Sequence, residues 1–134
     1  MPLFAATEKA LLEQIVGRSP EAKRYVMLLT AAPTAGMTLA EVEAKRLKYT
    51  GYADIETTKA SWGAASGEDP ASITNSAELS AKEWEAGANE EATYFAIREE
   101  GKLVGYEKLT AGVVVGAGNK TASFAVSTLT IKLT

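Results

Sequence analysis

Ser127-Thr-Leu-Thr-Ile-Lys-Leu-Thr134 is the stretch that decides the fold. Leu129, Ile131 and Leu133 alternate with threonine and lysine side chains along it. This strict period of two predicts a β-strand with one buried face and one solvated face. Such two-sided strands are typical of antiparallel sheets, so we expect an antiparallel β-protein.

The segments before this strand repeat the pattern of short strands separated by turns. A hairpin is expected at Glu99-Glu-Gly-Lys102, where Gly101 would supply the positive φ of a tight turn. About eight short strands at regular spacing indicate an all-β sandwich or barrel. We therefore predict a mainly β fold, an antiparallel and jelly-roll-like β-sandwich. The expected strands cover residues 23–30, 52–59, 71–80, 93–98, 102–109, 113–115, 121–126 and 127–134.

Two helices are expected beside the strands. Thr7 is a candidate N-cap for a helix that ends at Val16. Thr38 and Glu41 have the spacing of a capping box, which predicts one short helix over residues 39–47, inserted after the first strand.

The N-terminal helix carries an apolar stripe, formed by Leu11, Leu12, Ile15 and Val16. A helix this short is marginal alone, so the stripe must dock on the rest of the chain or on another protein. The pattern leaves both open. Our hypothesis is that residues 1–22 form an arm that binds a partner, and that residues 23–134 form the β-sandwich domain.

The composition excludes several classes of function. The chain has 134 residues, no His, no Cys and a net charge of −3, which suits one domain. Without His, a serine nucleophile lacks its usual base. No basic stripe points to nucleic acid, and no apolar run is long enough for a membrane span. The N-terminus lacks the pattern of a signal peptide, so we expect synthesis in the cytoplasm.

Candidate chemical sites are few. Asp54 and Glu56 would share one strand face and could bind a cation, although exposed acids commonly have no function. Five dispersed aromatic residues could instead stack on a sugar, but each also suits a core: Trp62, Trp84, Tyr49, Tyr52 and Tyr94. No spacing indicates a catalytic group, a metal site or a cofactor, so we do not expect an enzyme.

A series of segments, in a fixed order along the chain, carries a resemblance to known proteins. The segments are Leu28-Leu-Thr-Ala-Ala-Pro-Thr34, Tyr49-Thr-Gly-Tyr-Ala53, Trp62-Gly-Ala-Ala65, Ile73-Thr-Asn-Ser-Ala-Glu-Leu79, Ala92-Thr-Tyr-Phe-Ala-Ile97, Gly101-Lys-Leu-Val-Gly-Tyr106, Gly118-Asn119 and Ser123-Phe-Ala-Val-Ser-Thr-Leu-Thr-Ile-Lys-Leu133. In this order they resemble a family of small structural proteins of tailed bacteriophages, described as capsid decoration (minor capsid) or tail-fibre proteins. The resemblance covers about residues 25–134 and leaves the first twenty-odd residues outside. This chain departs from the family pattern at Asp54 and Glu107.

The resemblance implies a β-rich virion component without catalytic residues. We expect a capsid decoration protein that is made in the host cytoplasm and binds the major capsid protein lattice on the outer surface of the head. A tail-fibre or receptor-binding tip module is the alternative, and a carbohydrate-binding domain is a third. Because a symmetric partner can cover sheet edges, we expect a homotrimer, with a dimer as the alternative. Nucleic acid and membrane are not expected partners.

Overall fold

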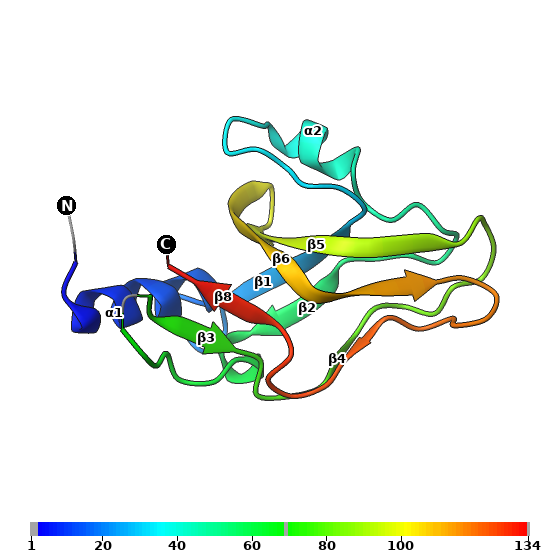
Figure 1. Cartoon of the computed structure of the whole chain (residues 1–134). Helices are drawn as coiled ribbons and strands as arrows, with labels where there is room; N and C mark the ends of the chain where they lie inside the picture. The colour runs from blue at the N-terminus through cyan, green and yellow to red at the C-terminus, as the bar shows by residue number, and fades with distance from the viewer. Residues whose placement is uncertain (1–2, 69, 134) are drawn as a thin grey trace.

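The computed structural model describes residues 3–68 and 70–133. A helix at the N-terminus precedes an antiparallel β-structure, and a short helix follows the first strand (Figure 1). The elements are α1 (Ala5–Val16), β1 (Lys23–Leu29), α2 (Leu39–Glu43), β2 (Ile55–Thr58), the 3-10 turn η1 (Lys59–Ser61), β3 (Ser72–Thr74), β4 (Leu79–Ser80), β5 (Glu90–Glu99), β6 (Lys102–Val115), β7 (Ser123–Phe124) and β8 (Thr130–Lys132).

The largest sheet has four strands in the order β2-β1-β5-β6, and every pair is antiparallel. β1 lies inside this sheet and is apolar from Val26 to Leu29, all four residues being fully buried. A continuous apolar run is what a strand covered on both faces requires. The prediction of a buried strand over residues 23–30 is therefore confirmed.

The two faces of the sheet pack against different layers. On one face, Val26, Leu28, Phe95 and Ile97 join the main hydrophobic core, together with residues of α1 and of the small sheets. On the other face, a second and smaller core covers the sheet beneath α2. Its buried members are Met27, Leu29, Val42 and Ala96.

Two small antiparallel sheets, β3-β8 and β4-β7, complete the layer over the main core. Asn75, fully buried, joins them. Its amide nitrogen donates to the carbonyls of Ala77 and Ala125, and its oxygen accepts the N–H groups of Thr128 and Leu129. A mainly β, antiparallel and sandwich-like fold with an N-terminal helix and a short inserted helix is thus confirmed.

The last strand has the predicted faces. Leu129 and Ile131 are buried, Leu133 is half-buried, and Lys132 is exposed. Thr134 lies outside the described residues. The dry face of β8 packs on the main core, as its period of two requires.

The β5-β6 hairpin differs from the prediction in two ways. The positive φ of its turn belongs to Glu100, at 50°, and not to Gly101. The two strands expected over residues 102–109 and 113–115 are one strand, β6, because both parts pair with β5. The register shifts twice, near Thr93 and near Val104, so β6 bends where residues 109–112 lie opposite Thr93.

The helix boundaries also differ from prediction. α1 begins at Ala5, with Phe4 and not Thr7 at the N-cap, so no side chain caps this end. The predicted capping box of α2 is present: Thr38 Oγ1 accepts the N–H of Glu41, and the Glu41 carboxylate accepts the N–H of Thr38. α2 ends at Glu43, earlier than expected.

Candidate interaction surface

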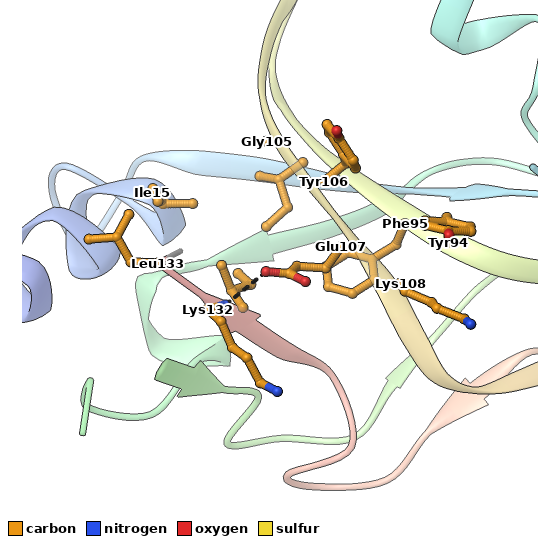
Figure 2. Close-up of a pocket in the computed structure, with 11 residues that line it drawn as sticks. Ile15, Tyr94, Phe95, Gly105, Tyr106, Glu107, Lys108, Lys132 and Leu133 are labelled. Atoms are coloured by element: carbon orange, nitrogen blue, oxygen red, sulfur yellow. Dashed lines mark hydrogen bonds between the residues drawn. The ribbon is translucent and has the colours of Figure 1, made fainter. Parts of the chain in front are cut away.

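A groove with a volume of about 510 Å³ opens between the β5-β6 pair and β8 (Figure 2). Ile15 of α1 and Leu133, after β8, close one end of it, and both are half-buried. Charged side chains also line the groove. The full lining is Ile15, Tyr94, Phe95, Ile97, Gly105, Tyr106, Glu107, Lys108, Ile131, Lys132 and Leu133.

Gly105 keeps the groove open. It pairs with Ile97 of β5, whose side chain belongs to the main core, so a side chain at Gly105 would point to the same face of the sheet. A Cβ atom built on Gly105 meets no atom within 4 Å, and its φ is not in the left-handed region. The groove therefore exists because this position has no side chain, not because the backbone needs glycine.

Glu107 forms the polar wall of the groove. One carboxylate oxygen accepts the backbone N–H of Lys132 at 3.0 Å, which joins β6 to β8 (Figure 2). Among the ion pairs of the described residues, none involves Glu107. The groove thus combines an apolar floor with two lysines, Lys108 and Lys132, and a carboxylate that forms none of these ion pairs.

β6 is also exposed on the opposite face of the sheet. A second groove of about 230 Å³ lies there, beside the loop that leads to α2, and it includes Val104 and Tyr106. Val104 is 37% exposed and Tyr106 is 44% exposed. As the edge strand of the four-stranded sheet, β6 presents the longest free strand edge in the described part of the chain.

The four predicted partner-binding residues do not form one free surface. Leu12 and Val16 are fully buried in the main core, whereas Leu11 is 39% exposed and Ile15 is half-buried at the end of the groove. The stripe therefore packs largely on its own domain, the option that the pattern had left open. α1, which precedes residue 22, and the strands that follow it contribute side chains to the same hydrophobic core.

Arg24 of β1 fastens the end of α1. Its buried guanidinium donates to the carbonyls of Ile15 and Gln14, at 3.0 and 3.3 Å, and pairs with Glu99 at 3.3 Å. These bonds satisfy carbonyl groups that the end of a helix leaves without partners, and a cation suits the negative end of the helix dipole.

Asp54 and Glu56 are not a cation-binding pair. The Asp54 side chain is 2% exposed and forms ion pairs with Arg98 at 2.9 Å and Arg46 at 3.2 Å. Glu56 pairs instead with Lys23, and this hydrogen bond raises the pKa of the Lys23 ammonium. The expectation that both acids share a strand face is wrong, because Asp54 precedes β2 and is a buried structural group.

Tyr52 connects the Asp54 cluster to the central strand. Its hydroxyl donates to Asp54 at 2.7 Å and accepts the N–H of Leu28 at 2.9 Å. Burial raises the pKa of Tyr52 well above its usual range, and the Asp54 charge raises it further. The cluster holds the loop before β2 against β1, which is a structural role.

The aromatic residues do not form a shared exposed platform. Tyr49 and Trp62 are buried, and Tyr52 and Trp84 pack partly buried against the main core. Tyr94 packs against the second core, on the other side of the sheet. Their positions suit a core role, the alternative that their dispersed spacing had suggested.

Among residues 3–68 and 70–133, no group of three or more acidic side chains is placed to hold a metal ion. None of the helices in that same part of the chain combines the length and the apolar character that a membrane crossing needs.

The described part of the chain is an antiparallel β-domain with a long edge strand, two grooves beside that strand, and polar clusters that hold the fold together. Residues 3–132 match the family model described as podophage GP4 fiber I protein gp80, so the chain belongs to this family of tailed-phage structural proteins. No curated protein matches the chain. It is a virion structural protein of a tailed phage.

The match also corrects the extent of the resemblance. The family pattern begins at residue 3 and includes α1, whereas the sequence segments had placed the first twenty-odd residues outside it. The position of α1 outside the resembling segments therefore gives no reason to expect that α1 binds a partner.

The sequence analysis did not predict the groove. A glycine inside an alternating strand, as in Val104-Gly-Tyr106, is nevertheless a signal for an open position.

Proposed function

We propose that this protein is a subunit of a fibre on the phage virion. The observation that carries the proposal is the match of residues 3–132 to a family described as a podophage fibre protein. In this role the domain catalyses no reaction, and it binds neighbouring subunits through its exposed surfaces. The exposed strand β6 and the grooves beside it are the surfaces available for that purpose.

A homotrimer remains our expected state of the subunit, with a dimer as the alternative. Oligomers of one chain are mostly closed and symmetric, and a free sheet edge as long as β6 is commonly covered or blunted. We expect no catalytic activity, and neither nucleic acid nor a membrane as partner. These expectations rest on the composition and on the use of the polar clusters within the fold.

Capsid decoration is the second candidate, favoured by the compactness of the chain. All described secondary structure packs around two cores on one sheet, and the described chain contains no repeated or extended shaft. A small domain that binds only the assembled lattice of the major capsid protein would stabilise the head by mass action. Several weak contacts of a symmetric oligomer would add to each other at a symmetry axis.

The copy number per virion distinguishes the two candidates. A decoration protein on the capsid surface is present in proportion to the capsomers, whereas a fibre subunit is present in proportion to the fibres. We expect quantitative mass spectrometry of purified virions to give the lower value, and antibody labelling in electron micrographs to mark fibres. A ratio near that of the capsomers, with label spread over the head, would contradict the fibre proposal and support decoration.

A further inference from the structure

The start of α1 carries an exposed apolar pair. Phe4 is 86% exposed, the highest value among the exposed large apolar residues of the described chain, and its neighbour Leu3 is 39% exposed. The pair directly precedes α1, and the start of α1 lies at one end of the molecule (Figure 1). One exposed apolar side chain is ordinary, but two adjacent ones at an end of the molecule suit insertion into another surface.

The same end carries a partial positive charge. Phe4 occupies the N-cap, where its side chain cannot accept a hydrogen bond from the first turn. Glu8 lies in that turn, but its carboxylate accepts the backbone N–H of Ala71. Since a helix N-terminus attracts negative groups, a complementary surface would combine an apolar pocket with a carboxylate.

The groove beside β6 has this combination. Its apolar surface includes Ile15 and Leu133, and the space above Gly105 is empty. The carboxylate of Glu107 stands in its wall, accepts the backbone N–H of Lys132 and forms no ion pair among the described residues. The groove's volume of about 510 Å³ lies within the range of about 300–1,000 Å³ that is usual for ligand pockets. Lys108 and Lys132 also line it, and both side chains are exposed to solvent.

A chain cannot place its own Phe4 in its own groove. Ile15 lines the groove, whereas Phe4 precedes the opposite end of the same helix. At 1.5 Å per residue, the 12 residues of α1 separate the two by about 16 Å. A Phe4 side chain that fills this groove must therefore come from a second copy.

We propose that Leu3 and Phe4 of one copy dock into the groove between β6 and β8 of the next copy. The contact joins two different surfaces, so it is heterologous and repeats from copy to copy. It closes into a ring, such as a trimer, when the rotation per copy divides a full turn, and otherwise continues as a filament. The inference deepens the proposed function by naming a contact between subunits, and only its setting in a fibre rests on that function.

One small contact is expected to be weak in isolation, because stable interfaces bury a larger area. We therefore expect reversible association of the purified chain, measured by sedimentation velocity up to about 1 mM. Phe4→Ser removes the inserted side chain and should weaken association by at least about tenfold. Gly105→Leu fills the groove without a steric clash and should do the same.

Matched controls separate these effects from general changes in surface. Val126→Ser removes another exposed apolar side chain, and Gly118→Leu adds a side chain where a Cβ also meets no atom within 4 Å. Both controls should associate like the unchanged protein. If Gly105→Leu fails to fold, as judged by circular dichroism, Glu107→Lys replaces it, because a cation there should repel the helix N-terminus.

Mixing the two variants gives the decisive measurement. Phe4→Ser retains its groove and Gly105→Leu retains its Phe4, so an equimolar mixture should form a one-to-one complex although neither variant self-associates. Absence of that complex, unchanged association of Phe4→Ser, or a monomer at about 1 mM would each overturn the proposal. These results concern the purified chain alone, so they are independent of where the virion carries the protein.

Discussion

Replacing Leu12 with alanine tests whether α1 belongs to the core of the domain. Leu12 is fully buried in the main core, against residues of the strands. Replacing a fully buried leucine with alanine typically costs about 2–5 kcal/mol of unfolding free energy, from lost burial and from the cavity that remains. We expect about 3 kcal/mol here, a large part of the 5–15 kcal/mol that is usual for a domain.

Leu11→Ala is the matched control, because it makes the same chemical change at the next position of the same helix. Leu11 is 39% exposed, so its truncation leaves little cavity. Alanine also has a slightly better helix propensity than leucine. We expect a change within about 0.5–1 kcal/mol.

Urea unfolding followed by tryptophan fluorescence measures both variants. Trp62 is 5% exposed and belongs to the same core as Leu12, so its emission reports the loss of that core. The midpoint should fall for Leu12→Ala with little change in the slope m, since the surface exposed on unfolding is almost the same. If the unfolding free energy fell by the same small amount in both variants, α1 would be a peripheral arm and its assignment to the core would be refuted.

Three further predictions concern the buried polar groups. Asp54→Asn should cost about 2–4 kcal/mol in urea unfolding, because it removes a buried charge that two arginines share. The matched control Glu56→Gln lies in a half-exposed pair and should cost less than about 1 kcal/mol. Burial raises the pKa of Tyr52 in the folded state. The contribution of the protonated Tyr52 hydroxyl to the unfolding free energy should therefore be fully present below about pH 10 and should be lost as the pH rises further. Tyr52→Phe should reduce this loss of stability at high pH, as measured by urea midpoints at about pH 8 and about pH 11. The same difference between the two midpoints in Tyr52→Phe and in the parent would contradict the reasoning. Asn75→Ala should cost about 2–4 kcal/mol, since it leaves several buried backbone groups without partners, and a thermal melt unchanged from the parent would contradict this.

The features that the sequence predicts well are those that local chemistry decides. The alternation around Ile131 and the capping box of Thr38 and Glu41 each involve neighbours within a few residues, and both are present. The apolar run of β1 likewise indicated a buried strand. Such patterns hold because the burial of one face or the capping of one turn does not depend on distant parts of the chain.

The features that the sequence could not predict depend on segments far apart. Asp54 is buried because Arg46 and Arg98 converge on it, and Arg98 is 44 residues away along the chain. The groove likewise needs α1, β6 and β8 to meet at one place. The family resemblance indicated the class of protein. It began near residue 25, however, whereas the family match begins at residue 3 and includes α1.

The sequence could not show which apolar residues of α1 are exposed, for a related reason. An apolar stripe at helical spacing fits the protein's own core and a partner surface equally well. Burial decides between them: Leu12 and Val16 face inward, and the exposed apolar residue is Phe4, which stands before the first helical turn.

The two register shifts of β6 have a consequence for the free protein between synthesis and assembly. A long, flat and unpaired strand would recruit identical strands indiscriminately and lead to amyloid-like precipitation. In β6 the bend at residues 109–112 and the irregularity near Val104 leave no regular run of backbone groups long enough for such templating, and Lys102 and Lys108 add repulsion. We therefore expect a concentrated pool of subunits to stay free of amyloid-like precipitate, which would leave the proposed side-chain docking, and not backbone pairing, to select the neighbour.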